Sequence, residues 1–277
     1  MDEDSYRGWR RPGPEPPRGI EPDEGETLDY ICGRFRIFQY AKGHRYSTDD
    51  VLTAWYGTLC APRVDRAADL GSGIGSVAII AAWRLPGATF CTVEAQEQSL
   101  RLARKSIRYN GLESRFTLIH GDLREFVHDP VFDLVTGSPP YWPPGTASEA
   151  AHSQAIPARI EIRGSVADYA LAARRILAPA GVFAFVFPTV QLARAVSAID
   201  DASLKLIRRR DVVFKEGEPP LVSLFACARV EDLPSSYEAF VEEPLVIRCA
   251  DGSVSREYSA VRMSVGIPPG NVGRLVG

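Results

Sequence analysis

The sequence has little that could hold a metal ion or build a disulfide framework. Its cysteines are scattered without any C-x-x-C pair, and its histidines fall on different predicted elements. Paired cysteines are typical of zinc and dithiol sites, and disulfides belong to oxidising compartments. We therefore expect a reducing environment and no metal site. The residues concerned are Cys32, Cys60, Cys91, Cys227 and Cys249, together with His44, His120, His128 and His152.

Long apolar segments are also absent. No run approaches the roughly 18 residues that a membrane-spanning helix needs, and the first residues lack the apolar core of a signal peptide. We expect a cytoplasmic protein with no membrane partner. The sequence contains no internal repeat and leaves the oligomeric state open.

Neither sign of charge dominates the chain, whose formal net charge is −3 at pH 7. The first 29 residues hold nine acidic side chains and four arginines, so the remainder is slightly positive. Any nucleic-acid site must therefore be a local patch. The densest basic cluster, Lys205 with Arg208, Arg209 and Arg210, could contact phosphate or could be the solvated edge of a strand.

With 277 residues, 45% of them hydrophobic, the chain is long enough for one sizeable α/β core with extensions. Residues 1–26 are rich in Pro, Gly, Glu and Arg, which predicts a disordered acidic arm. Residues 27–60 alternate and then become helical, as in a hairpin and helix packed on the core. We expect the main domain over 61–230 and a C-terminal hairpin and tail over 231–277.

A strand, a glycine turn and a helix follow one another at the start of this main domain. Arg66–Leu70 predicts the strand, Gly71-Ser-Gly-Ile-Gly75 the turn and Val77–Trp83 the helix. Missing side chains let a ligand approach the backbone, so the unit is typical of nucleotide binding. Glu94 ends the next predicted strand, where a carboxylate can accept hydrogen bonds from ribose hydroxyls.

Two further polar positions have both a structural and a functional interpretation. Asp122 follows the predicted strand Phe116–Ile119 and could accept from an adenine amino group, or could cap a short helix over 123–127. The loop Lys42–Asp50 precedes an apolar helix that Ser47 or Thr48 would cap. This loop could close over the amino-acid end of a small cofactor, or it could only start the helix.

The predicted strand Val131–Thr136 runs into the segment Ser138-Pro-Pro-Tyr-Trp142. Each proline removes an N–H and favours extended geometry in the residue before it. The Ser138 hydroxyl and the Pro139 carbonyl could then accept both N–H groups of an exocyclic amine and free its lone pair for attack. Tyr141 could stack on a base, and Trp142 could wall the site or face a cation. The alternative is a proline turn that only ends the strand.

Because successive parallel strands end at one edge of a sheet, we expect these polar positions to meet there, where ligands bind in open α/β sheets. A long Pro-, Ala- and Ser-rich loop follows over 143–164. Its charged residues Arg159, Glu161 and Arg163 could meet a substrate. The positions expected at the edge are Gly71, Glu94, Asp122 and Ser138.

These motifs resemble those of the class I S-adenosylmethionine-dependent methyltransferases, and among them the tRNA(Val) adenine-N6 methyltransferase family. The resemblance covers about residues 28–262 and implies a Rossmann-like, mostly parallel, seven-stranded sheet with helices on both faces. It also implies S-adenosylmethionine as cofactor, tRNA as partner and residues 61–230 as the methyltransferase domain. The more specific blocks are Arg36-Ile-Phe-Gln39, Gly43–Asp50, Ala158–Glu161, Pro244–Ile247 and Asp251-Gly252.

The resemblance assigns roles to individual residues. It implies that the glycine turn cradles the methionine part of the cofactor, that Glu94 holds its ribose, and that Asp122 with Leu123 holds its adenine. The methionine part would contact Asp69, Gly71, Gly73 and Gly75, with Thr48 and Asp49 lining its end. The target base would contact Ser138, Pro139, Tyr141 and Trp142, with Arg159 and Glu161 as further substrate contacts.

Two positions depart from the family pattern. Ser138 stands where the family usually has Asn, and a Ser-Pro-Pro-Tyr segment also resembles cytosine-N4 methyltransferases. Ile160 stands where a His is expected. The sequence has no Pro-Cys nucleophile pair, so we expect direct transfer to nitrogen. Cytosine N4, a protein glutamine, and a non-catalytic RNA-binding role are the alternatives.

Overall fold

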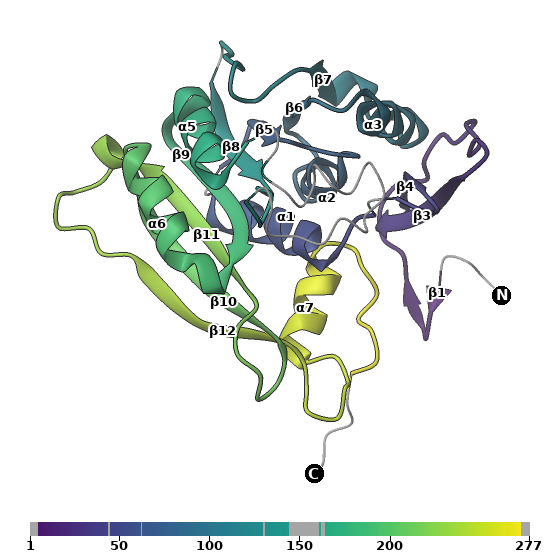
Figure 1. The fold of residues 1–277 in the computed structure, drawn as a ribbon. Helices are drawn as coiled ribbons and strands as arrows, with labels where there is room; N and C mark the ends of the chain where they lie inside the picture. Colours follow the sequence, from purple (N-terminus) through teal and green to yellow (C-terminus); the bar gives the residue numbers. More distant parts are fainter. Residues whose placement is uncertain are drawn as a thin grey trace.

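Apolar strands alternate with helices through the middle of the chain, and the strands pair into one mostly parallel sheet (Figure 1). The computed structural model describes residues 5–43, 45–61, 63–129, 131–143, 161 and 164–272. Strand β11 is antiparallel to both of its neighbours. The order across the sheet is β12 (Phe240–Arg248), β10 (Leu204–Lys215), β11 (Val222–Arg229), β9 (Leu177–Pro188), β8 (Phe132–Gly137), β5 (Arg66–Leu70), β6 (Thr89–Glu94) and β7 (Phe116–His120).

The Rossmann-like fold is confirmed, with eight strands in place of the expected seven. The additional strand is β12, which pairs in parallel with β10 from Arg208↔Phe240 to Lys215↔Arg248. The expected C-terminal hairpin forms at the Asp251-Gly252 turn, where Arg248 and Val254 make an antiparallel bridge, but the strand that leads into it belongs to the large sheet. Leu245 and Ile247 alternate and are buried, so this segment is stabilised by joining the large sheet, and α7 (Arg256–Ser264) follows it.

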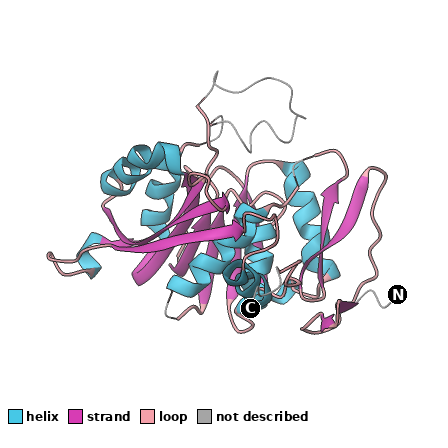
Figure 2. Cartoon of the chain, turned by 90° about the horizontal axis from the view of Figure 1, so that it is seen from below, coloured by secondary structure: helices cyan, strands magenta, loops and turns pink. Residues whose placement is uncertain are grey.

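Helices cover both faces of the sheet (Figures 1 and 2). One face packs against α1 (Thr48–Cys60), α2 (Ser76–Arg84), α3 (Glu97–Tyr109) and α7, and the other against α5 (Val166–Ile176) and α6 (Leu192–Asp201). Strand β9 is apolar on both sides for this reason. Its Phe183 and Phe185 rings stack at 5.0 Å within the α5 and α6 layer. Short 3-10 turns lie at Glu113–Arg115, Thr189–Gln191 and Val230–Asp232.

Within the described ranges, no helix is both long and apolar enough to cross a bilayer.

The expected N-terminal hairpin is confirmed as β3 (Glu26–Cys32) paired with β4 (Phe35–Tyr40). The expected disordered arm is corrected over its described part. This part contains the small hairpin of β1 (Ser5–Tyr6) and β2 (Trp9–Arg10) and then runs beside α3, where the Arg18 amide donates to the Tyr109 carbonyl at 3.2 Å. Acidic side chains hold it to the basic face of α3.

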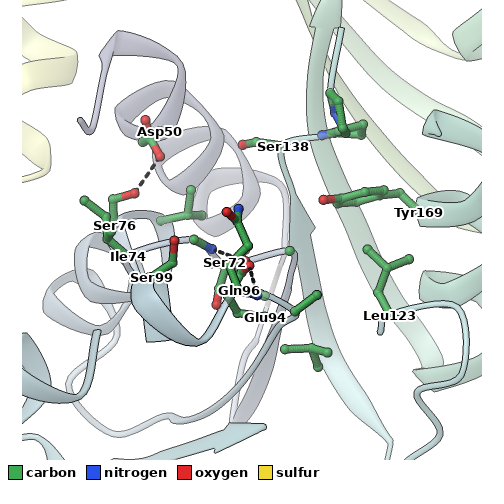
Figure 3. Close-up of a pocket in the computed structure, with 18 of the residues that line it drawn as sticks. Asp50, Ser72, Ile74, Ser76, Glu94, Gln96, Ser99, Leu123, Ser138 and Tyr169 are labelled. Atoms are coloured by element: carbon green, nitrogen blue, oxygen red, sulfur yellow. Dashed lines mark hydrogen bonds between the residues drawn. The ribbon is translucent and has the colours of Figure 1, made fainter. Parts of the chain in front are cut away.

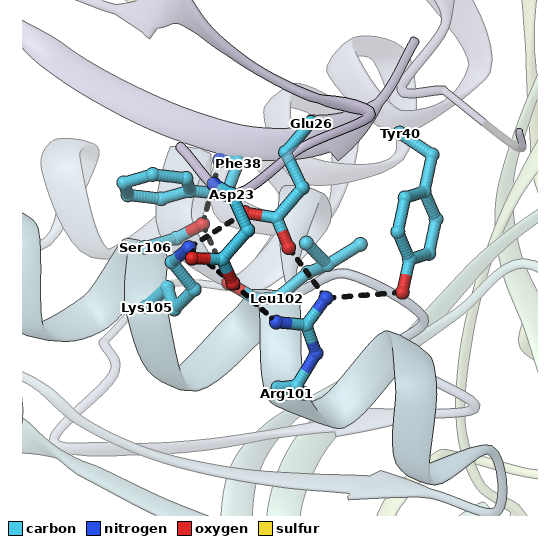
Figure 4. A network of polar contacts seen from close by, with 8 residues as sticks. All are labelled: Asp23, Glu26, Phe38, Tyr40, Arg101, Leu102, Lys105 and Ser106. Carbon is cyan, nitrogen blue, oxygen red and sulfur yellow. Dashed lines mark hydrogen bonds and ion pairs between the residues drawn. The ribbon is translucent and has the colours of Figure 1, made fainter. Parts of the chain in front are cut away.

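Glu26 is the centre of this attachment (Figure 4). Its side chain is fully buried, and its Oε2 lies 2.6 Å from Nζ of Lys105 and 3.0 Å from the Asp23 amide. Arg101 pairs with its other oxygen and also with Asp23 at 2.7 Å. Burial alone would raise the pKa of Glu26, but the hydrogen bonds from Lys105, Asp23 and Arg101 outweigh it and lower that pKa.

Replacing Glu26 by Gln should lower the free energy of unfolding by about 2–3 kcal/mol, because the mostly buried Lys105 loses the nearer of its two carboxylate partners. The loss stays in this range because Arg101 is partly exposed to solvent. Denaturant unfolding at pH 7 measures the loss. Glu24→Gln, the same change on an exposed side chain two residues away, is the control and should change stability by less than about 0.5 kcal/mol.

The same experiment has a pH signature. Since the folded state lowers the pKa of Glu26, its contribution is complete above its unfolded pKa and is lost as the pH falls through the folded value. The difference between wild type and Glu26→Gln should therefore shrink towards acidic pH. A difference that stays constant below pH 4 would contradict this account.

Candidate active site

A cavity of about 640 Å³ opens at the carboxyl edge of the sheet. Its walls come from the ends of β5, β6, β7 and β8, from the segment before α1, and from α5. Figure 3 shows Ser138 and Tyr169 on one side of it and Asp50 and Ser76 on the other. The volume lies within the range of pockets that hold cofactors.

The glycine turn forms one wall of this cavity. Gly71, Gly73 and Gly75 all have positive φ, at 61°, 55° and 84°. The Gly73 amide donates to Oε2 of Glu94 at 2.8 Å, and the Gln96 amide donates to Oε1 at 2.7 Å. A Cβ atom added at Gly73 would meet no atom within 4 Å, so the turn leaves its backbone open to a ligand. Glu94 holds the turn to the end of β6.

Asp69 lies at the floor of the cavity and is 2% exposed. Its Oδ1 accepts from Thr136 Oγ1 at 2.8 Å, and its Oδ2 has no hydrogen-bond partner in the described part of the chain. Burial raises the pKa of Asp69 to about 7, although the Thr136 hydrogen bond opposes this. A cation in the cavity would favour the ionised form of this carboxyl.

The Ser-Pro-Pro-Tyr segment leaves β8 at the same edge. Ser138, Pro139, Tyr141 and Trp142 all line the cavity. The Ser138 hydroxyl oxygen is buried and, among the described residues, has no hydrogen-bond partner. The Tyr141 ring packs edge-on against Phe187 at 6.0 Å, and its backbone carbonyl accepts from Gln191 at 2.6 Å. The cavity wall thus contains both a buried hydroxyl oxygen without a partner, that of Ser138, and an aromatic ring held by its neighbours, that of Tyr141.

The first turn of α1 contributes two adjacent acids. Ser47 is the N-cap, and its capping box includes Asp50, as the cap prediction required. Asp50 also accepts from Ser76 Oγ at 2.5 Å, at the start of α2. Asp49 accepts from the Tyr141 hydroxyl at 2.5 Å, and burial raises the pKa of this carboxyl.

A second, apolar pocket of about 400 Å³ adjoins the first. Ser47, Asp49, Tyr141 and Trp142 line both, so these residues form the wall between them. The far side of the second pocket is apolar, and Val190 and Leu221 at its rim are well exposed. Its remaining lining residues are Thr48, Pro188, Phe214 and Val222.

Comparison with known proteins finds similar sequences among methyltransferases. Residues 52–161 match the model of the methyltransferase small domain. A relative from Dyadobacter fermentans, named tRNA1(Val) (adenine(37)-N6)-methyltransferase, is 26% identical over 73% of this chain and 81% of its own. A ribosomal protein uL3 glutamine methyltransferase from Bradyrhizobium diazoefficiens is 38% identical, but over only 28% of this chain and 24% of its own.

The fold has matching solved structures. A predicted O-methyltransferase from Agrobacterium tumefaciens superposes with a TM-score of 0.59 at 17% identity, over 83% of this chain and 100% of that one. The chain has the class I methyltransferase fold and is an S-adenosylmethionine-dependent methyltransferase. Its cofactor is S-adenosylmethionine, and the large cavity at the sheet edge has the size, the open glycine turn and the unsatisfied polar atoms that such a group requires.

The methyltransferase brings most of the predicted site residues together. The residues lining the large cavity are Asp49, Asp69, Gly71, Gly73, Glu94, Asp122, Leu123, Ser138, Pro139, Tyr141 and Trp142. Asp122 does not cap a helix, because residues 123–125 form only a turn; it accepts from the Arg124 amide at 2.9 Å and pairs with its guanidinium.

Four predicted residues lie elsewhere or outside the description. Thr48, the first residue of α1, lines only the second pocket. Gly75 does not line the cavity; it is the N-cap of α2 and packs against Ala103. Glu161 lines neither pocket and pairs with Arg194 at 2.7 Å. Arg159 is outside the described residues.

Sequence reasoning missed several lining residues, of which Tyr169 is the most consequential. It comes from α5, and a methyl group added at Gly71 would lie 2.9 Å from its Cζ and closer still to its hydroxyl. At Gly137 an added methyl would lie 2.7 Å from its Cδ1. The Tyr169 ring therefore explains why positions 71 and 137 are both glycine. The helical sequence around Tyr169 gave no signal that this residue would reach the cavity. The other missed residues include Gly43, Arg45, Asp50, Ser72 and Ser76.

Replacing Gly71 by Ala should lower the free energy of unfolding by about 3 kcal/mol, because the methyl group strains a left-handed residue and collides with Tyr169. In a Tyr169→Phe background the loss should fall by about half, since the closest atom is then missing. Denaturant unfolding of the four proteins measures both losses.

Gly73→Ala is the matched control for this prediction. It has a similar positive φ but no neighbouring atom within 4 Å, so it should cost only about 1 kcal/mol. Equal losses at the two glycines, in either background, would show that backbone strain and not Tyr169 determines the requirement at Gly71.

Proposed function

We propose that this methyltransferase transfers a methyl group from S-adenosylmethionine to the exocyclic amine of a nucleic-acid base, adenine N6 in tRNA. The observation that carries the proposal is the buried Ser138 hydroxyl oxygen, without a described partner, beside the Tyr141 ring at the cavity wall. An acceptor aimed at an aromatic amine, next to a stacking surface, fits this chemistry better than attack on carbon or oxygen. The tRNA-modifying relative matches most of the chain.

We assign the other residues the roles that the family resemblance implies, and their positions around the cavity support this assignment. The glycine turn and Asp69 would hold the methionine part of the cofactor, Glu94 its ribose, and Asp122 with the Leu123 backbone its adenine. S-adenosylmethionine, when bound, supplies an electrophilic methyl group. Ser138 and the Pro139 carbonyl would accept from the two amine hydrogens, which localises the nitrogen lone pair without a covalent enzyme intermediate.

The substrate base would have to be unpaired or flipped, because an amine inside a duplex cannot enter such a cavity. The adjoining apolar pocket supports this, since its wall offers apolar and aromatic surface to a flat ring. A protein glutamine is the second candidate, favoured by the higher identity to a glutamine methyltransferase over a short segment.

Analysis of the products tests the proposal. Wild-type enzyme and S-adenosylmethionine are incubated with bulk tRNA, with DNA and with total protein, and the digests are analysed by mass spectrometry. N6-methyladenosine in tRNA is expected. N4-methylcytosine or a methylated glutamine as the main product would replace the proposed substrate.

Ser138→Ala should lower kcat about 10–100-fold and change the Kd for S-adenosylmethionine less than twofold, because it removes an acceptor that the amine needs in the transition state. Single-turnover kinetics and calorimetry measure the two effects. Ser72→Ala is the matched control, since Ser72 also has an unpartnered buried oxygen but lies in the glycine turn. Ser72→Ala should raise the Kd for S-adenosylmethionine more than it lowers kcat. If Ser138→Ala mainly raised the Kd and Ser72→Ala mainly lowered kcat, the assigned roles of the two serines would be wrong.

Cofactor affinity should rise with pH through about 7 and then level off. The sign follows from Asp69, whose raised pKa leaves it partly neutral below pH 7, whereas the cofactor's ammonium favours its ionised form. Relative to Asp69→Asn, wild-type affinity should increase on the order of tenfold between pH 6 and 8. Calorimetry in buffers of different ionisation enthalpy should also detect proton release at pH 6.5, and the absence of release would contradict the assignment.

A further inference from the structure

The wall between the two pockets contains one hydrogen bond that the proposed chemistry has not used. Tyr141 donates its hydroxyl to Oδ2 of Asp49 at 2.5 Å, from a loop after β8 to the first turn of α1. The two residues are 92 positions apart in the sequence. A hydrogen bond to a carboxylate is among the stronger ones, especially where solvent is excluded.

This bond completes the restraint of the Tyr141 side chain. Gln191 holds its backbone carbonyl at 2.6 Å, and Phe187 packs edge-on against its ring. The Asp49 carboxylate fixes the far end, the hydroxyl. With both ends held, rotation about the Cα–Cβ bond is restrained, and the edge-on contact with Phe187 restrains the face of the ring before any substrate binds.

Asp49 is itself held in place. Its carbonyl accepts from Thr53 Oγ1 at 2.8 Å, and its carboxylate lies in the first turn of α1, where the helix dipole favours a negative charge. The next residue, Asp50, bonds Ser47 and Ser76, so the same helical turn is fixed to the start of α2. Asp49 therefore fixes the position of Tyr141 relative to α2, the helix that follows the glycine turn.

We propose that Asp49 is a positioning residue for the methylated base, acting through the hydroxyl of Tyr141 and not by contact with the cofactor. This rests on the proposed function, in which Tyr141 stacks on the base. It departs from the role that the family resemblance implies, namely lining the methionine end. A ring that is misplaced by about 1 Å can cost on the order of 10²-fold in rate, so the bond matters although it touches no reacting atom.

A double-mutant cycle tests the proposal. Asp49→Ala and Tyr141→Phe each remove the bond, so each should lower kcat/KM for the acceptor about 10–100-fold. The double variant should have a kcat/KM no lower than that of the less active single variant. The Kd for S-adenosylmethionine should stay within about twofold in all three. Independent, multiplying losses, or a tenfold loss of cofactor affinity in Asp49→Ala alone, would overturn the proposal.

Two further variants separate positioning from charge. Asp49→Asn keeps a side-chain carbonyl that can accept from Tyr141, so it should recover to within about fivefold of wild type; a variant as poor as Asp49→Ala would mean that the negative charge itself is required. Asp50→Ala, in the same helical turn, is the matched control and should show losses independent of Tyr141→Phe. Thermal unfolding checks that each variant is folded.

The cycle is run on whichever acceptor, tRNA, DNA or protein, the wild-type enzyme methylates. A wild-type enzyme that methylates protein glutamine but shows the expected coupling would refute the proposed substrate and leave the positioning role standing. If the wild-type enzyme methylates tRNA but the losses in the two variants multiply independently, the proposed substrate would stand and the positioning role of Asp49 would be refuted.

Discussion

Two glycines at the ends of neighbouring strands leave room for one tyrosine ring, and both halves of the active site depend on that contact. Gly71 begins the glycine turn after β5, and Gly137 is the last residue of β8, just before the Ser-Pro-Pro-Tyr segment. Leu70 and Gly137 are partners in the parallel register. Tyr169 from α5 lies against both glycines. A side chain at either position would push the ring into the cavity or move the strand end, so this contact fixes the turn and the loop relative to each other.

The charge of the cavity follows from the same sheet edge. Carboxylates arrive from β5, β6, the end of β7 and the start of α1, and Arg45 is the one cation among the described lining residues. Arg45 is also engaged, by Asp29 at 2.8 Å and Thr27 at 3.0 Å. The excess of acids favours a ligand that carries positive charge, and it disfavours anions. Burial then decides how each acid behaves: Glu94 accepts two backbone amides, while Asp69 keeps one oxygen unpaired and a raised pKa.

The sequence was informative wherever function depends on the end of a strand. Glu94, Asp122 and Ser138 could be placed at one edge because parallel strands all end there, and a repeated β-α pattern predicts such strands. Tyr169 could not be found in this way, since it is 98 positions from Gly71 and lies within an ordinary amphipathic helix. The ordered N-terminal segment was missed for a related reason. Its composition suggested disorder, but its acidic side chains form ion pairs with Arg101 and Lys105 on α3. These tertiary contacts cannot be inferred from the composition of the segment.

Ser138 illustrates how a departure from a family pattern can be reconciled with the same chemistry. A hydroxyl is shorter than the side-chain amide of Asn, so in the proposed function the amine must lie closer to the backbone at Ser138 than it would at an Asn. Burying that oxygen without a partner costs on the order of 1–3 kcal/mol in the unliganded protein. In the proposed function, an amine that donates to this oxygen would recover the cost, most fully when the nitrogen is most polarised. A serine that lacks a partner before the substrate binds would then favour the transition state over the empty site.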